Sequence, residues 1–179
     1  CPGVELHLMC IDDEAELERA LWHGDADCGF LVAPAKRALK SIPLHDDPIM
    51  VLLPPDHALG HADHVPTRTL AEEPFIQPRS RSIREAEALL RNSGAKPHVR
   101  FAVDSYYNVM NMVSKGLGFS ILPGLLLEDA TLPLTVLPPQ LKMRREISIA
   151  MRSADTASAA TRAFVQTVRT WVAQRYEER

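Results

Sequence analysis

Two arginines and two serines between residues 77 and 82 offer the clearest chemistry in the sequence. The run Gln77-Pro78-Arg79-Ser80-Arg81-Ser82 follows a predicted strand and precedes a predicted helix. The first N–H groups of a helix lack carbonyl partners, so they attract an anion, and guanidinium groups bind carboxylates through paired hydrogen bonds. The pattern indicates a small anion site, although arginines in loops are often only solvated.

A second junction of the same kind lies at Asp104-Ser105-Tyr106. These residues follow the apolar run 99–103 and open a helical pattern. Asp104 and Ser105 are good N-cap residues, because a short side-chain oxygen accepts from the first free N–H groups. We expect Asp104 to cap the helix rather than to bind a ligand. Tyr106 and Tyr107 could stack on an aromatic ligand, although one of them could only pack.

Three histidines could form a metal site, but a loop is the better interpretation. His57, His61 and His64, with Asp63 beside them, have spacings that suit one helical face. The stretch has a loop-like composition, however, and no cysteine accompanies it. The sequence also lacks the G-x-S-x-G, H-E-x-x-H and glycine-rich phosphate-binding motifs. We therefore expect no enzyme, no metal and no cofactor.

The composition is that of an ordinary globular chain. The 179 residues are 46% hydrophobic and 24% charged, and the formal net charge of −3 gives no overall attraction to nucleic acid. The cysteines Cys1, Cys10 and Cys28 form no CxxC pair, which favours buried thiols in a reducing compartment. No apolar run could span a membrane, and the start carries no signal-peptide pattern. These features predict a cytoplasmic protein.

Strands and helices alternate along the sequence, which predicts a mostly parallel α/β arrangement. Expected strands lie at residues 4–8, 28–32, 48–53, 70–76, 99–103, 118–122, 134–137 and 147–151. Capping boxes predict helix starts at Asp13 with Glu16 and at Ser82 with Glu85, and the first of these helices should complete a βαβ unit. The last helix is expected to turn inward Phe164, Val165, Val168, Trp171 and Val172.

The stretch from Asp104 to Pro123 has the most informative pattern. Apolar residues follow at helical spacing up to Gly116, which can end the helix in the left-handed conformation. The run Gly118-Phe119-Ser120-Ile121-Leu122 then predicts a buried strand that stops at Pro123. A helix that leads through two glycines into an apolar strand predicts a helix packed on its own sheet.

This stretch also resembles a known family. The run VMNMVSKGLGFSILP, residues 109–123, is similar to a segment of the effector-binding domain of LysR-type transcriptional regulators. Four further segments resemble that domain in the same order, at residues 21–30, 43–59, 69–76 and 145–168. Each segment is loose alone, but their order and spacing together are specific. The resemblance covers essentially the whole chain.

The resemblance implies an α/β, two-lobed, type 2 periplasmic-binding-protein-like fold with two chain crossovers. With proline-marked connectors near Pro74 and Pro138, we expect residues 1–72 and 142–179 to form regulatory lobe I, and residues 73–141 to form regulatory lobe II. A LysR effector domain normally begins with one more strand and most of a helix. The N-terminal strand and helix of lobe I are therefore expected to be missing here.

The resemblance also implies a function. The domain would sense a small, carboxylate-bearing metabolite in the cleft between the lobes and bias a DNA-binding domain that is absent from this chain. The expected partners are this effector, a second copy in a homodimer or tetramer that could cover an edge strand at residues 4–8, and DNA only through the absent domain, with no membrane. The alternatives are a stand-alone solute-binding or transport component and an enzyme on the same fold.

The expected effector-binding residues combine the two junctions with positions that line the cleft in the family. Ile11, Asp12, Val32, Ala33 and Phe119 are included by resemblance alone. Asp12 and its neighbour Asp13 would repel an anionic effector unless they point away. The full predicted set is Ile11, Asp12, Val32, Ala33, Gln77, Pro78, Arg79, Ser80, Arg81, Ser82, Asp104, Ser105, Tyr106 and Phe119.

Overall fold

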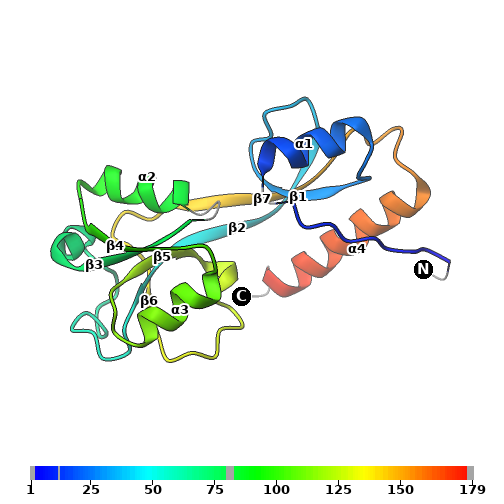
Figure 1. Ribbon diagram of the computed structural model, residues 1–179. Coiled ribbons are helices and arrows are strands. Elements are labelled where there is room, and N and C mark those ends of the chain that lie inside the picture. Colours follow the sequence, from blue (N-terminus) through cyan, green and yellow to red (C-terminus); the bar gives the residue numbers. More distant parts are fainter. Residues whose placement is uncertain (1–2, 12, 80–82, 177–179) are drawn as a thin grey trace. The chain divides into compact units, whose positions relative to one another are not determined.

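Two strands, β2 (Lys40–Leu53) and β7 (Arg144–Met151), carry the chain between two compact units. The computed structural model describes residues 3–11, 13–79 and 83–176. Unit 1 consists of Cys1–Asp46 and Arg145–Arg179, and unit 2 consists of Asp47–Arg144. Each boundary between the units falls inside a strand, so the chain passes out once and back once without a break in β2 or β7 (Figure 1).

The boundaries of the units differ from those suggested by the prolines. The first boundary follows Asp46, whereas the predicted division placed it after residue 72. The 3-10 helix η1 (Thr67–Glu72) and strand β3 (Pro74–Pro78) both belong to unit 2. Prolines mark turns between elements, but this crossing occurs within a continuous strand and leaves no such signal. The regulatory role expected of the two lobes stays a prediction for these units.

Unit 1 packs helix α1 (Glu14–His23) on strand β1 (Gly29–Val32). Asp13 Oδ1 accepts from Glu16 N–H at 2.8 Å, and Gly24, at φ 83°, ends the helix in the left-handed conformation. The core beneath the helix is formed by Leu21, Leu31 and Ala150. β1 pairs antiparallel with β7. The predicted helix, its caps and the strand after it are confirmed.

The last helix, α4 (Ala159–Tyr176), completes unit 1. Ser158 Oγ accepts from Thr161 N–H at 3.0 Å, and Val165 packs on Ile149 of β7. The prediction that Trp171 points inward is wrong, since it is 55% exposed. The apolar neighbours of α4 reach only as far as Val168, so Trp171 lies beyond them. Among the described residues, no helix combines the length and the apolar character needed to cross a membrane.

Residues 4–8 form no strand, so the expected strand and its βαβ unit are wrong. Val4, Leu6 and Leu8 are 49%, 58% and 83% exposed, and the segment has no regular hydrogen bonding. The alternating pattern marks a sequence that can pair, but a strand needs a neighbour to stabilise it. In the described part of the chain, β1 pairs only with β7. The edge strand expected to receive a partner subunit is therefore not formed either.

Unit 2 has helices on both faces of its sheet (Figure 1). Its strands β3, β4 (His98–Val103) and β5 (Ser120–Pro123) alternate with helices α2 (Ile83–Ser93) and α3 (Tyr106–Ser114). A short 3-10 helix, η2 (Gly124–Leu126), follows, and β6 (Thr135–Leu137) pairs with β2. The predicted second strand begins only at Pro74, because residues 67–72 form η1.

Alternation along the strands explains why both faces of unit 2 are apolar. Phe75 and Ile121 pack with α2, whereas their neighbours Ile76 and Leu122 pack with α3. Successive side chains of a strand point to opposite faces, so a continuous apolar run buries both. From the helices, the buried contacts are Ala86, Leu89 and Leu90 of α2, and Val109, Met110 and Val113 of α3.

The strand pairing is more antiparallel than the alternating pattern predicted. β3 and β4 pair in parallel, and Phe75 bridges to Phe119 in the same sense. β2, however, pairs antiparallel with both β5 and β6, and β1 pairs antiparallel with β7. The prediction of a mostly parallel sheet is wrong, because the two strands that carry the chain between units add antiparallel neighbours. The order of elements along a sequence does not reveal this.

Gly118 connects α3 to β5 at a point where two backbones meet. It has φ +150°, and a Cβ there would clash with the carbonyl oxygen of Pro74. Phe119 N–H donates to that same oxygen at 3.0 Å. Two residues before Gly118, Gly116 has φ 74° just after the end of α3. The predicted helix, glycine stop and buried strand are confirmed.

Candidate functional site

The ends of β3 and β4 bring two predicted segments together within unit 2. Arg79 N–H donates to Val103 O at 2.8 Å, so the pairing of the two strands continues past Pro78. Residues 77–79 and 104–106 therefore leave the sheet at the same edge. The carboxyl ends of parallel strands are the usual place for ligands in open α/β sheets. This edge is the candidate site.

Ser105, and not Asp104, caps α3. Ser105 has an extended backbone, with φ −99° and ψ 123°, and its Oγ accepts from Asn108 N–H at 3.4 Å. Asp104 lies one residue too early, so the expectation that it caps the helix is wrong, and its side chain is exposed. The N–H of Tyr107 lies in the first turn, where no preceding carbonyl of the helix can accept from it.

Arg79 brings a guanidinium to this edge. Its side chain is exposed, and no described carboxylate lies within ion-pair distance of it. Ser80, Arg81 and Ser82 lie outside the described residues. The predicted pairing of two guanidinium groups and the capping box between Ser82 and Glu85 therefore stay predictions.

Of three other predicted residues of unit 2, two are buried in its interior and one, Gln77, turns toward α2. Gln77 Nε2 donates to Glu87 Oε1 at 3.4 Å, which turns the Gln77 side chain toward α2. Pro78 is buried. Phe119 is fully buried, with its ring centroid 5.1 Å from that of Phe75. In this arrangement these side chains support the strand ends from behind, and Phe119 presents no surface to a ligand.

The residues assigned to unit 1 by resemblance lie before α1 and at the end of β1. Val32 is the last residue of β1, and Ala33 N–H continues the pairing with a bond to Glu146 O at 2.9 Å. Both side chains are partly exposed, as is Ile11. Asp12 lies outside the described residues.

Glu18 is a functional candidate that the sequence did not reveal. It lies on α1, is only 6% exposed, and accepts from Lys36 N–H at 2.9 Å and from Arg37 N–H at 3.0 Å. The carboxylate thus fixes the loop that follows Ala33. The available signal was that Glu18 follows the inward-facing Leu17 and so lies close to the buried side of the helix. A carboxylate buried there needs hydrogen-bond donors, which the backbone of residues 36 and 37 supplies.

His57 is engaged with a carboxylate rather than with its neighbouring histidines. Its Nε2 lies 3.1 Å from both carboxylate oxygens of Glu73, and its Nδ1 accepts from Leu59 N–H at 3.2 Å. Because Nδ1 accepts, the ring proton belongs on Nε2 and is donated to Glu73. Over the described ranges, no three metal-ligating side chains are grouped closely enough to hold a metal ion.

The cysteines differ in their environments. Cys10 is exposed, so the expectation of buried thiols is wrong for this residue. Cys28 is partly buried, and burial, with a smaller contribution from the Asp27 carboxylate, raises the pKa of its thiol. A raised pKa disfavours the reactive thiolate. Cys1 lies outside the described residues.

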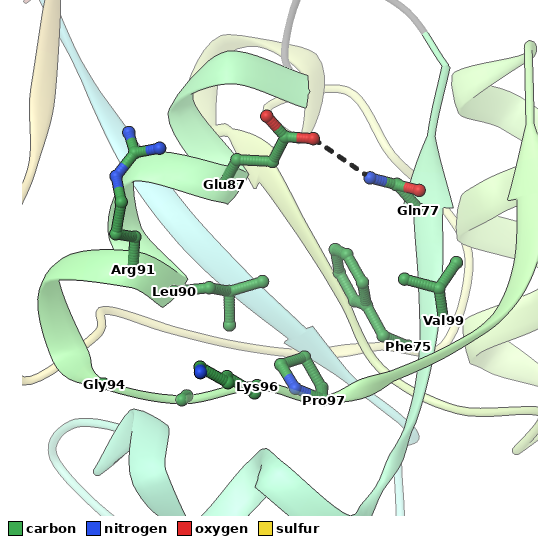
Figure 2. A pocket seen from close by; sticks show the side chains of 10 residues that line it. Phe75, Gln77, Glu87, Leu90, Arg91, Gly94, Lys96, Pro97 and Val99 are labelled. Carbon is green, nitrogen blue, oxygen red and sulfur yellow. Dashed lines mark hydrogen bonds between the residues drawn. The ribbon is translucent and has the colours of Figure 1, made fainter.

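A cavity of about 360 Å³ lies within unit 2, beneath the C-terminal half of α2 (Figure 2). Phe75 and Val99 form its wall on the strand side, and Leu90 faces them from the helix. Its mouth carries the side chains of Glu87, Arg91 and Lys96. No sequence pattern indicates this space, because it depends on how the turn between α2 and β4 folds back.

Comparison with known proteins places this chain in a family of regulators. Residues 1–173 match the LysR substrate binding domain family. A Mycobacterium leprae protein named "Probable hydrogen peroxide-inducible genes activator" is 27% identical over 176 residues, which cover 91% of this chain and 55% of that protein. The Bacillus subtilis "Uncharacterized HTH-type transcriptional regulator YwbI" is 26% identical over 125 residues, or 68% of this chain and 41% of that protein. The chain thus spans about half the length of these relatives.

Solved structures agree with this match. The C-terminal domain of a probable LysR family transcriptional regulator from Rhodococcus sp. RHA1 is 25% identical, with a TM-score of 0.75, and the match covers 86% of this chain and 79% of that one. The Synechocystis PCC6803 CcmR regulatory domain in complex with 2-PG is 22% identical, with a TM-score of 0.82 and coverage of 96% and 85%. The BenM effector binding domain with its effector benzoate is 22% identical, with a TM-score of 0.75 and coverage of 92% and 77%. The chain therefore belongs to the LysR substrate-binding domain family and has that family's periplasmic-binding-protein-like fold.

Proposed function

We propose that this chain is the effector-binding regulatory part of a LysR-type transcriptional regulator. It binds a small, carboxylate-bearing metabolite at the edge of unit 2 where β3 and β4 end. The observation that carries this proposal is the hydrogen bond from Arg79 N–H to Val103 O, which holds the Arg79 backbone next to the segment that leads into α3. The related domains whose structures were solved with 2-PG and with benzoate support a small-molecule role.

The start of α3 supplies what a carboxylate needs. The first-turn N–H groups of Tyr106 and Tyr107 carry the positive end of the helix dipole. Ser105 Oγ accepts from the Asn108 N–H, and the N–H of Tyr107 is proposed to face the ligand. Arg79 adds a full positive charge. Asp104 opposes an anion, but its exposed carboxylate is screened by water, which reduces the repulsion.

The remaining predicted residues have different roles in this proposal. Ser80, Arg81 and Ser82, which follow Arg79 in the sequence, are proposed to contact the effector. Ile11, Asp12, Val32 and Ala33 of unit 1 are included by the resemblance alone. Gln77, Pro78 and Phe119 act by positioning the strand ends. An amide titration of the ¹⁵N-labelled chain with a stabilising acid tests each assignment.

In the whole protein, effector binding would change the equilibrium between states that differ in DNA affinity. The curated relatives are named as an activator and as a helix-turn-helix type regulator, which favours regulation over the transport alternative. We propose that the complete protein is cytoplasmic, acts as a dimer or tetramer, contacts DNA through a separate domain and catalyses no reaction.

A thermal-shift screen of the 179-residue chain against organic acids tests the site. At about a hundredfold excess over Kd, a bound acid should raise Tm by about 5 °C. Arg79→Ala should weaken binding about tenfold, as expected for loss of a charged hydrogen bond. Arg152→Ala, at an exposed arginine of unit 1, is the matched control and should leave the shift unchanged. The proposal fails if no acid stabilises the chain, or if both variants respond like the unaltered protein.

A further inference from the structure

The cavity beneath α2 does not include Arg79 and, except for Gln77, is built from a different set of side chains than the effector edge. Its floor is apolar: Phe75 and Leu90 are 1% and 7% exposed, and Ala95 is 4% exposed. Val99 lies at the rim and is 46% exposed. Figure 2 shows the Phe75 ring and Val99 on one side of the space and Leu90 on the other. An apolar side chain or ligand placed here would be covered on two sides.

The space exists because two local features keep the chain away from the helix. Gly94, at φ +71°, ends α2 and turns the chain back toward the sheet. At the start of β4, Val99 pairs with Phe75 and Phe101 pairs with Ile76, so Arg100 is an extra residue that bulges from the strand. The bulge leaves Val99 on the same side as Phe75. Because Gly94 has no side chain and that of Ala95 is small, the space between the helix and the strand stays unfilled.

The charged side chains at the mouth of the cavity favour the binding of an anion. Arg91 comes from the last turn of α2 and Lys96 from the turn that follows, and both residues line the cavity. No ion pair joins either of them to another described residue. The one carboxylate at the mouth, Glu87, accepts a hydrogen bond from Gln77 Nε2. Two cations against one engaged carboxylate give the mouth a net positive charge.

We propose that this cavity is a second ligand site, which takes a small monocarboxylate with a flat or branched apolar body. The body lies between Phe75, Leu90 and Val99, and the carboxylate faces Arg91 and Lys96. A volume of about 360 Å³ is near the lower end for small-molecule pockets, so it suits a single ring with a short acidic arm. The site goes beyond the effector edge, because apart from Gln77, which donates to Glu87 at the cavity mouth, it shares none of the groups that act there.

Titration of the ¹⁵N-labelled 179-residue chain with 3-phenylpropanoate tests this site. Binding should shift the amide resonances of Gly94, Ala95 and Val99 in a saturable way, with a Kd of about 1 mM for a ligand of this size. The neutral analogue 3-phenylpropanamide should bind more weakly, because it loses the attraction to the two cations. Saturable shifts confined to Arg79 and Ser105 would overturn the second site while supporting the effector edge.

Two sets of variants make the test specific. Val99→Trp should fill the cavity and abolish the shifts, whereas Val136→Trp, the same change at an exposed valine of β6, should not. Arg91→Gln combined with Lys96→Gln should weaken the acid about fivefold and leave the amide analogue unaffected. Lys142→Gln with Arg144→Gln changes the net charge equally at exposed positions outside the cavity and is the control.

The charge variants keep the proposal falsifiable even if Val99→Trp fails to fold, since Arg91 and Lys96 are exposed and their replacement should leave the spectrum native. The proposal is overturned if 3-phenylpropanoate binds the double variant as tightly as the unaltered chain. It is equally overturned if the acid and its amide bind with the same affinity.

Discussion

Unit 1 and unit 2 are stabilised in different ways, although both pack helices on strands. Unit 2 is one continuous segment, Asp47–Arg144, with apolar clusters on both faces of its sheet. Unit 1 joins segments from opposite ends of the chain through the pairing of β1 with β7, and its clusters are smaller. Trp22 and Phe30 of unit 1 are 40% and 50% exposed. Most helices and strands of unit 2 follow one another along one segment, whereas unit 1 is held together by pairing between the two ends of the chain.

This difference predicts that unit 2 is the more stable unit and that single changes there have larger costs. The two tryptophans, Trp22 and Trp171, both lie in unit 1, so tryptophan fluorescence reports on that unit. Amide hydrogen exchange of α2, α3 and β5 reports on unit 2. The two probes together can separate the unfolding of one unit from that of the other.

The largest effect is expected from Gly118→Ala in unit 2. The methyl group would collide with the Pro74 carbonyl oxygen at a φ that side chains rarely adopt, so we expect a loss of about 4 kcal/mol. Gly24→Ala in unit 1 is the matched control. Gly24 also has a positive φ, but nothing lies near its added Cβ, so the cost should be about 1 kcal/mol.

Urea denaturation with both probes measures these costs. Equal destabilisation by the two glycine variants would contradict the view that close backbone packing around Gly118 organises unit 2.

A smaller but still large effect is expected from Glu18→Ala in unit 1. Removal of the carboxylate leaves the N–H groups of Lys36 and Arg37 without their acceptor, which should cost about 2 kcal/mol. Amide exchange at these two residues should speed up, while exchange in α2 and α3 stays slow. Glu18→Gln keeps one acceptor and should lose about half as much. Faster exchange in unit 2 would show that the units are not independent.

The helix caps give a matched comparison of the two units. Ser105→Ala in unit 2 and Asp13→Ala in unit 1 each remove one side-chain acceptor, from Asn108 N–H and Glu16 N–H respectively. Each change should cost about 1 kcal/mol. Fluorescence should detect only the Asp13 variant, and exchange in α3 should detect only the Ser105 variant. A response of both probes to either variant would count against separate units.

The smallest effect concerns Cys28 and pH. Because the folded-state pKa of its thiol is raised, folding favours the protonated form. This contribution to stability is present below the unfolded thiol pKa and is lost as the pH rises through the folded pKa. At about pH 8, near the ordinary thiol pKa, iodoacetamide should modify the exposed Cys10 several times faster than Cys28, as read by peptide mass spectrometry. Equal rates in the folded chain would contradict the assignment.

Much of unit 2 was predictable from the sequence because its signals are local. The helix that begins after Ser105, the glycines at 116 and 118 and the buried strand before Pro123 all follow from short-range chemistry. The order of family-like segments then indicated the fold. What failed depended on partners distant in the chain: residues 4–8 alternate like a strand, but no described strand pairs with them.

The candidate site shows the same limit at the scale of single residues. The sequence placed Arg79 and Ser105 at two junctions, and the pairing of β3 with β4 brings them to one edge. It could not separate Ser105 from Asp104 as the cap, because both residue types cap helices equally well. The apolar run predicted a buried strand at Phe119, whereas the resemblance placed the same residue in the effector site. The cavity beneath α2 could not be foreseen, since it depends on how one face of the sheet is filled.

The central claim is that the carboxyl ends of β3 and β4 bind the effector. The most direct test is an amide titration of the ¹⁵N-labelled chain with whichever organic acid stabilises it in the thermal-shift screen. We predict that the largest saturable shifts occur at Arg79, Ser105, Tyr106 and Tyr107, and that Arg79→Ala greatly reduces them. Saturable binding of that acid without any shift at these four residues would contradict the account.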